Sequence, residues 1–304
     1  MKQSMYRILS NEQIAQSIYR MRLGGDISPI AAPGQFVNIR IDGLYLRRPI
    51  SVCDVREDEM TLVYKTVGRG TAKMSEMEAG DELDILCGLG NGFDTSRSGK
   101  NPLLIGGGVG TPPLYLLCRR LIEEGKITHW GLSEVTEDTI RRAHKICPVT
   151  AIQNRYSMMF RNYEALFGVL EELNIGLVAF SPLANGFLTA RYTAESKFDP
   201  KEDYRSAMPQ FKKEAFAQNG NLLALLEETA KAKNAAPGQI SLAWMLNKKP
   251  YIVPIPGTRK LNRLAENLGA ADIVLTAGEV AAIDEALDNM TMSNVFGGTR
   301  VIKR

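Results

Sequence analysis

The chain has 304 residues, 44% of them hydrophobic and 23% charged, and its 37 basic and 34 acidic side chains leave a formal charge of +3. This is the composition of an ordinary globular protein, long enough for one large α/β domain or two of average size. The basic residues are scattered and form no stripe, which argues against a nucleic-acid partner. No apolar stretch approaches the roughly 20 residues that a transmembrane helix needs. The start, MKQSMYRILS, lacks a signal-peptide pattern, so we expect a cytoplasmic protein with no membrane partner.

The four cysteines are Cys53, Cys87, Cys118 and Cys147, which lie far apart in the sequence. They form no CxxC pair and have no histidine close by, so the spacing of a metal site is missing. We expect reduced thiols and no bound metal.

Residues 1–100 alternate short apolar runs with turns rich in glycine, proline and aspartate. This period-two pattern predicts antiparallel strands that close as a small β-barrel. The runs are IYRMRL, QFVNIRI, LRRPISVCDV, MTLVYKTVG and DELDILCGLG.

Two segments of this region have the residue types of an anion site. Residues 48–51 (RPIS) begin a predicted strand, where Arg48 suits a pyrophosphate and Ser51 suits the edge of a flavin ring. Residues 65–71 (KTVGRGT) end a strand in glycines and a hydroxyl residue at a helix start, which presents backbone N–H groups to an anion. The alternative for the first segment is an exposed arginine before an edge-strand proline. The alternative for the second is a glycine-rich loop with Thr71 as a plain N-cap.

In this order, the segments resemble the FAD-binding barrel of the ferredoxin-reductase type. The resemblance extends over residues 1–122 and is strongest to the electron-transfer subunit of NAD-dependent dihydroorotate dehydrogenases, on the segments LRRPISV, KTVGRGT, GLGNGF and LLIGGGVGTPPLYLL. It implies a bound FAD and a partner, the dihydroorotate dehydrogenase catalytic subunit, which would bind through the barrel. The implied FAD-binding residues are Arg48, Pro49, Ser51, Lys65, Gly68, Gly70 and Thr71.

Residues 101–122 are typical of the first βα unit of an NAD-binding domain. Residues 102–105 predict a buried strand, and the glycine-rich turn 106–110 leads into a helix from about Pro112. The resemblance implies that NAD contacts Gly107, Gly108, Gly110 and Thr111. Related proteins continue to closely spaced cysteines that hold a [2Fe-2S] cluster; this chain has no such run, and we expect no cluster.

Residues 123–304 repeat βα units, which predicts a parallel sheet or barrel with ligand groups at the carboxyl ends of its strands. Strands are predicted at HWGLS, VTAIQN, IGLVAFSPL and YIVPIPGT, and helices at TEDTIRRAHKI, YEALFGVLEELN, LLALLEETAKAK and KLNRLAENLG. The polar interval 189–219 predicts a long loop over the strand ends. A capping box at Thr276 predicts the start of the last helix.

This region resembles the C-terminal half of the aldo-keto reductases. The matching segments are GKITHWGLSE, PVTAIQNRYS, FSPLANGFLT and IPGTRKLNRLAENLGA. The resemblance implies half of a (β/α)8 barrel, with Ser133, Gln153 and Tyr156 at the nicotinamide, Gln153 holding its carboxamide and Tyr156 stacking on the ring. It further implies a pyrophosphate bordered by Ser181, Leu183, Asn185 and Gly186, and an adenosine 2′-phosphate held by Thr258, Arg259, Lys260, Arg263 and Asn267.

The alternatives for these residues are structural. The basic cluster at Arg259, Lys260 and Arg263 is also what a solvated helix face looks like, and Tyr156 would suit core packing. The tyrosine, lysine, aspartate and histidine that aldo-keto reductases use for catalysis come from the first half of their barrel. We therefore assign no catalytic residue in this chain, since neither His129 nor His144 stands at a matching position.

The sequence as a whole predicts a β-barrel followed by an α/β region, joined near residue 122 as a natural fusion, a recombination product or an assembled sequence. Its leading function is that of an FAD-binding, NAD(P)-linked oxidoreductase for electron transfer, with incomplete catalytic machinery. One alternative is an NADP-dependent aldo-keto reductase of small carbonyls, and another is a nonproductive fusion that only binds cofactor. Since half a barrel leaves sheet edges and apolar faces uncovered, we expect self-association.

Overall fold

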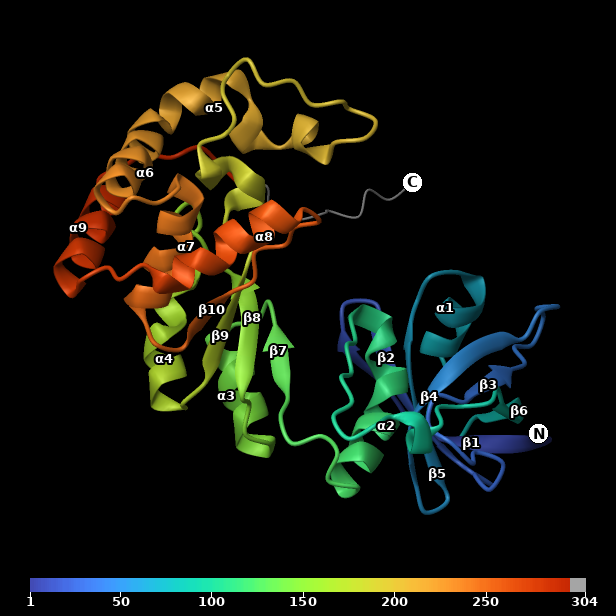
Figure 1. Ribbon diagram of the computed structural model, residues 1–304. Helices are drawn as coiled ribbons and strands as arrows, with labels where there is room; N and C mark the ends of the chain where they lie inside the picture. The colour runs from blue at the N-terminus through green and yellow to red at the C-terminus, as the bar shows by residue number, and fades with distance from the viewer. Residues whose placement is uncertain (296–304) are drawn as a thin grey trace. The chain divides into compact units, whose positions relative to one another are not determined.

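The computed structural model describes residues 1–295, and the chain divides into two compact units between Thr128 and His129 (Figure 1). The division lies a short way beyond the junction expected at residue 122. Each unit has a hydrophobic core of its own.

The first unit is a closed antiparallel barrel with the strand order β1-β2-β5-β4-β3-β6. Along its strands buried apolar residues alternate with more exposed ones, as Leu83, Ile85 and Cys87 do in β6, which confirms the predicted barrel. The strands are β1 (Lys2–Ala15), β2 (Ile18–Gly24), β3 (Phe36–Ile39), β4 (Arg48–Arg56), β5 (Glu59–Lys65) and β6 (Glu82–Leu89). Helix α1 (Arg69–Ser75) buries Met74, and the side-chain amide of Asn11 donates to the Met74 carbonyl at 2.8 Å.

Helix α2 (Pro112–Glu123) begins at the predicted Pro112 and packs against β4. The Arg119 guanidinium lies 2.7 Å from the carboxylate of Asp54, whose side chain is only 9% exposed. Because an unpaired buried carboxylate is unfavourable, this ion pair helps to hold α2 on the barrel.

The strand predicted at residues 102–105 is absent, which corrects the sequence prediction. Leu103 and Ile105 are 83% and 81% exposed, and their backbone pairs with no strand. A buried parallel strand needs neighbours on both edges to satisfy its N–H and C=O groups, and no such neighbours lie beside these residues.

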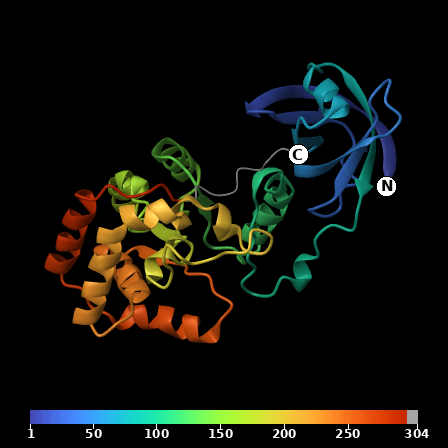
Figure 2. The same ribbon diagram turned by 90° about the horizontal axis from the view of Figure 1, so that it is seen from above.

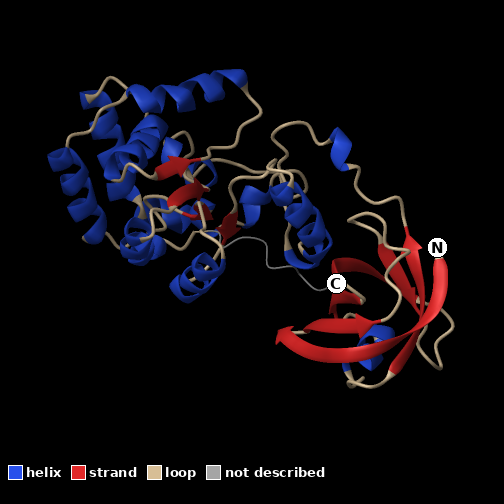
Figure 3. Cartoon of the chain, turned by 90° about the horizontal axis from the view of Figure 1, so that it is seen from below, coloured by secondary structure: helices blue, strands red, loops and turns tan. Residues whose placement is uncertain are grey.

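The second unit contains a four-stranded parallel sheet of order β10-β9-β8-β7, drawn in red in Figure 3. Its strands are β7 (Gly131–Ser133), β8 (Ala151–Arg155), β9 (Gly176–Phe180) and β10 (Ile252–Pro254). The helices are α3 (Glu137–Ile146), α4 (Phe167–Glu172), α5 (Lys213–Gln218), α6 (Gly220–Ala232), α7 (Pro237–Lys248), α8 (Leu261–Leu268) and α9 (Ala277–Asp288). All four predicted strands are confirmed.

Short 3-10 helices complete both units. They are η1 (Thr95–Arg97), η2 (Gly108–Gly110), η3 (Asn162–Leu166), η4 (Ala184–Thr189), η5 (Tyr204–Ala207), η6 (Pro209–Phe211) and η7 (Gly269–Asp272). The interval 189–219, predicted as one long loop, thus contains two of these turns and helix α5.

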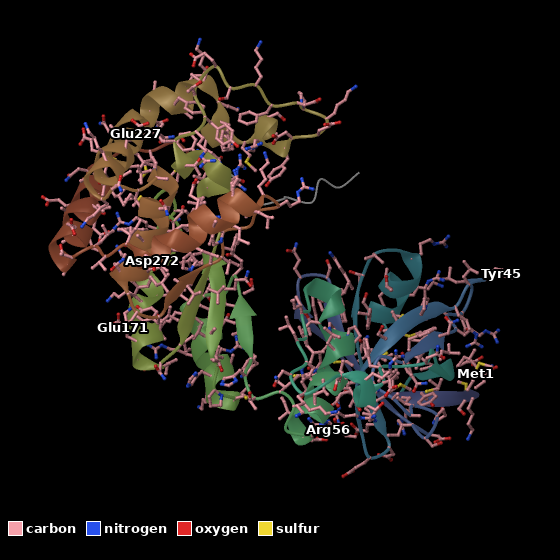
Figure 4. The ribbon with its side chains drawn as sticks, in the orientation of Figure 1. Met1, Tyr45, Arg56, Glu171, Glu227 and Asp272 are labelled. Atoms are coloured by element: carbon pink, nitrogen blue, oxygen red, sulfur yellow. The ribbon has the colours of Figure 1, made fainter. Side chains whose placement is uncertain are left out.

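Helix α7 is the centre of the second core. Its residues Leu242, Ala243, Trp244 and Met245 are buried, and it contacts α6, α8, α9 and β10. Figure 2 shows α6 and α7 side by side. The carboxylate of Glu171 on α4, labelled in Figure 4, accepts a hydrogen bond from Tyr251 at 3.0 Å and so ties α4 to the start of β10.

Among the described residues, no helix has both the length and the apolar character that crossing a membrane requires.

The predicted capping box gives a stability test for the second unit. The Thr276 hydroxyl accepts a hydrogen bond from the Glu279 backbone N–H, and the Glu279 carboxylate accepts one from the Thr276 N–H. We expect Thr276→Ala to lower the free energy of unfolding by about 1 kcal/mol. Both tryptophans of the chain lie in the second unit, so denaturation followed by tryptophan fluorescence measures this change.

Thr136→Ala is the matched control. Thr136 is also an N-cap residue, of α3, but its side chain makes no capping hydrogen bond. Equal losses for the two variants would contradict the role of the capping box.

Candidate functional site

The carboxyl ends of β9 and β10 lie side by side because the two strands are parallel. Val253 pairs with Val178 and Pro254 with Ala179, and the Ile255 N–H donates to the Ala179 carbonyl at 3.0 Å. The segments that follow the two strands therefore start from one edge of the sheet, where open α/β sheets bind their ligands.

The segment after β9 is a tight turn with unusual backbone geometry. Ser181, Ala184 and Asn185 have φ values of 52°, 46° and 61°, and Gly186 has 98°. These values lie in the left-handed region, which residues other than glycine adopt only when their surroundings hold them there. The buried Gln210 side chain supplies such support, since it donates to the Ala184 carbonyl at 3.3 Å.

The segment after β10 leads into α8. Together, the two segments enclose a cavity of about 290 Å³. The cavity is lined by Ser181, Pro182, Leu183, Asn185, Gly186, Thr189, Arg191, Tyr192, Tyr204, Arg205, Ile255, Pro256, Gly257, Thr258, Arg263, Glu266 and Asn267.

The three arginines that line the cavity differ in their partners. Arg191 forms an ion pair with Glu266. Arg205 is paired with Asp203 and lies over the rings of Tyr192 and Phe198, 4.8 and 4.7 Å from their centroids.

Arg263 is different, because no carboxylate among residues 1–295 lies within ion-pair distance of its guanidinium. Arg263 belongs to the first turn of α8, whose N-terminus has no side-chain cap. A cation next to an uncapped helix N-terminus favours an anionic ligand.

The structure brings most residues of the predicted phosphate site together. Ser181, Leu183, Asn185, Gly186, Thr258, Arg263 and Asn267 all line the cavity. Arg259 and Lys260 are exposed and do not line it.

Ser133 and Gln153 lie outside the cavity, on neighbouring strands of the same sheet. The two residues pair in register, both are exposed, and the Ser133 hydroxyl donates to the Gln153 carbonyl at 3.0 Å. They are thus available to a ligand at the carboxyl ends of these strands.

Tyr156 corrects the expectation that it stacks on a nicotinamide. Its side chain is fully buried, stacked on Trp244 at a centroid distance of 5.4 Å, and its hydroxyl donates to the Glu164 carboxylate at 2.6 Å. Burial raises the pKa of the Tyr156 hydroxyl far above its ordinary value, and the bond to Glu164 adds to this. Tyr156 therefore serves the core, which was the alternative considered from sequence.

Three residues in or near the site were not predicted from the sequence. Arg191 and Glu266 line the cavity as an ion pair, but a charged pair 75 positions apart has no local pattern. Phe180 ends β9 on the same side as Val178, which pairs with Gln153. Phe180 could have been predicted from the sequence, because it is an aromatic residue directly before the turn at Ser181.

In the first unit, Arg48 lies directly over Gly70. A Cβ atom at Gly70 would stand 2.0 Å from Arg48 Nε, so only glycine permits this approach. The hydroxyl of Thr71, predicted to contact FAD, accepts from the Val67 N–H at 2.9 Å and is buried. Thr71 therefore shapes the loop itself.

The remaining predicted residues of this unit are more accessible. Pro49, Lys65 and Gly68 are exposed and Ser51 is half-buried. Gly107, Gly108, Gly110 and Thr111 are exposed around η2, next to the start of α2.

The sequence profile of the Aldo/keto reductase family matches residues 112–288, which is more than half of the chain. The chain belongs to the aldo/keto reductase family. The match begins in α2 and includes every strand and helix of the second unit. It does not bear on residues 1–111, so the resemblance to the dihydroorotate dehydrogenase electron-transfer subunit stays a prediction.

Two curated relatives illustrate this membership. The chain is 42% identical over 175 residues to the aldo-keto reductase yakc [NADP(+)] of Schizosaccharomyces pombe, covering 56% of this chain and 51% of that protein. It is 41% identical over 167 residues to the aldo-keto reductase str7 of Strobilurus tenacellus, covering 54% and 49%. The chain thus spans about half the length of the curated relatives it matches.

A solved structure agrees with this fold. The glycerol dehydrogenase AKR11B4 from Gluconobacter oxydans superposes with a TM-score of 0.53 at 22% identity, covering 60% of this chain and 56% of that one. At this identity the likeness concerns the fold alone.

The structural role of Tyr156 and Glu164 gives a pH-dependent prediction for this aldo/keto reductase unit. Burial alone would raise the pKa of Glu164, but hydrogen bonds from Arg161, Tyr156 and Lys248 outweigh it and lower the pKa below its ordinary value. A lowered folded pKa means that Glu164 stabilises the fold at neutral pH. This contribution is lost as the pH falls below about 4.3, the usual glutamate value, and through the folded pKa.

We expect Glu164→Gln to reduce the free energy of unfolding by about 1–3 kcal/mol at pH 7, because it removes the half-buried carboxylate that Arg161, Lys248 and Tyr156 share. The difference from the wild-type chain should shrink below pH 4. Glu172→Gln removes an exposed partner of Arg141 and serves as the control, with a much smaller effect. Equal effects of the two variants at pH 7 would contradict this account.

Proposed function

We propose that this chain is an NADP(H)-binding oxidoreductase of the aldo/keto reductase family, and that its cavity holds the phosphate-bearing half of the cofactor. The observation that carries the proposal is the convergence of the turn after β9 and the start of α8 on one cavity that contains Arg263. Membership of the family and the NADP(+) in the name of the S. pombe relative support this choice of ligand.

The residues of the cavity suit the two phosphate groups of such a ligand. The polar turn at Ser181, Asn185 and Gly186 would border the pyrophosphate. Thr258 and Arg263 would hold the 2′-phosphate, since a guanidinium without a carboxylate partner forms charge-assisted hydrogen bonds to phosphate oxygens. Asn267, one turn further along α8, would bind the adenosine.

The rim of the sheet at the carboxyl ends of its strands would receive the nicotinamide. Gln153 and Ser133 are exposed there and would hold its carboxamide. Because Tyr156 is buried, we assign the stacking role to Phe180, which is partly exposed at the end of β9. The cofactor supplies a hydride when bound, and these side chains orient the ring that carries it.

Replacing Arg263 tests this assignment. We expect Arg263→Met to raise the Kd for NADPH by about 10- to 100-fold, since a hydrogen bond to a charged group is worth about 1.5–3 kcal/mol. The Kd for NADH should change little, because NADH lacks the 2′-phosphate. Titration calorimetry measures both constants.

Arg142→Met is the control, since Arg142 is 78% exposed on α3 and paired with Asp138. Equal losses of NADPH and NADH affinity in Arg263→Met, or a full effect of Arg142→Met, would contradict the assignment.

A second candidate function concerns the first unit, for which we propose flavin binding by the barrel. The specific observation in its favour is the contact between Arg48 and Gly70, which places a cation over the glycine-rich segment 68–71. A guanidinium in this position suits a pyrophosphate. The resemblance of the barrel to the ferredoxin-reductase type is consistent with FAD as the ligand.

This second candidate predicts a yellow protein. We expect the purified chain to take up FAD, visible as flavin absorption after desalting, and Arg48→Met to lose most of it. Arg20→Met, which removes an exposed ion pair between Arg20 of β2 and Glu12 of β1, should retain the flavin. A wild-type chain that stays colourless with added FAD would exclude flavin binding and leave the NADP(H) proposal untouched.

A further inference from the structure

Within residues 1–295, one face of the sheet in the second unit is covered by helices and the other is not. Leu177 and Ala179 of β9 point into the core, and so do Ile152 and Ile252 of the neighbouring strands. The alternating positions on the opposite face are accessible: Val253 is 55% exposed, and Gly131, Ser133 and Gln153 are exposed as well. Parallel sheets are normally covered on both faces, so this face lacks a partner.

Both edges of the sheet also lack a partner among residues 1–295. β10 pairs only with β9, and β7 pairs only with β8. The two edge strands run in the same direction and each is three residues long. Unpaired strand edges are templates for pairing with another chain.

The helix that follows one edge strand carries an exposed apolar stripe. Leu261, Leu264 and Leu268 of α8 recur on one face of the helix and are 85%, 45% and 66% exposed. A helix with its apolar stripe in solvent needs another surface to cover it.

The loops at the carboxyl ends of the two edge strands have opposite charges. Arg259 and Lys260 follow β10. Glu134 follows β7, as do Glu137 and Asp138 in the first turn of α3, which are ion-paired on that helix with Arg141 and Arg142. All five side chains belong to exposed residues. If β10 of one chain lies parallel to β7 of another, these loops meet at the same end of the sheet and attract each other.

We propose that a second copy of this chain covers the open face, with a twofold axis parallel to the strands. β10 of each copy pairs with β7 of the other, and two four-stranded sheets close into a ring of eight parallel strands. Eight strands are the number at which inward side chains fill such a barrel. A twofold axis satisfies both edges of both copies at once and leaves no edge for further growth.

Two rows of side chains on the open face would point into this ring. Gly131, Ala151 and Gly176 form one row of small residues, and Ser133, Gln153, Val178 and Val253 form the next. This inference goes beyond NADP(H) binding, because it rests on the sheet face, its edges and their charges.

Sedimentation velocity of the full chain at about 1–50 μM, concentrations chosen to bracket micromolar affinity, is the first test. We expect a species of twice the chain mass of 33.6 kDa. Val253→Glu places a charge inside the closed ring and should raise the dimer Kd by at least about 100-fold, since an unpaired buried charge is strongly unfavourable. Val274→Glu, at a 72% exposed position outside the sheet, should leave the dimer intact.

A charge exchange tests the pairing of the edges. The double variants Arg259→Glu/Lys260→Glu and Glu137→Lys/Asp138→Lys should each dimerise at least about tenfold more weakly, because like charges then meet at both joints. An equimolar mixture should recover dimers, since both joints of a mixed pair regain opposite charges. Native tryptophan fluorescence of each variant checks that it is folded.

Three results would overturn the proposal. They are a wild-type chain that is monomeric at 50 μM, a dimer that survives Val253→Glu, and a mixture of the charge variants that forms no mixed dimer. A wild-type chain that stays monomeric yet binds NADPH would refute only the dimer, whereas a wild-type chain that dimerises but binds no NADPH would refute only the proposed function.

Discussion

The parallel pairing of β9 with β10 is the interaction on which the cavity depends. It aligns the carboxyl ends of two strands that are more than 70 positions apart, so that the turn at Ser181 and the first turn of α8 enclose one space. The buried side chain of Gln210 then supports the turn, and α7 packs against β10 and η4. The shape of the cavity and the position of Arg263 in it therefore depend on how the core of the second unit packs.

Local patterns predicted much of this architecture and some of the site. Alternation predicted the barrel strands β2 to β6, and the Thr276–Glu279 spacing predicted the start of α9. Two elements were not predicted: β1, where Tyr6 and Ile8 are buried among polar neighbours, and α7, which is apolar on most sides and shows no amphipathic period. Tyr156 was misplaced because burial by Trp244 and Glu164 depends on residues distant in sequence.

The two family resemblances of the chain overlap in helix α2. The family match begins at residue 112, inside the segment that also resembles a dinucleotide-binding βα unit. In the structure α2 belongs to the first unit, where Arg119 pairs with the nearly buried Asp54 of β4. An amphipathic helix such as α2 can pack on the barrel through Arg119 as well as on a parallel sheet. A strand at residues 102–105, in contrast, needs partner strands and does not form.

We propose that Arg263 and its surroundings recognise a 2′-phosphate. The most direct measurement compares the binding of adenosine 2′,5′-bisphosphate with that of adenosine 5′-monophosphate by calorimetry, because these fragments lack the nicotinamide. We expect the bisphosphate to bind at least about tenfold more tightly, because its 2′-phosphate would accept one or more charge-assisted hydrogen bonds. Equal affinities, or no binding of either fragment, would contradict it.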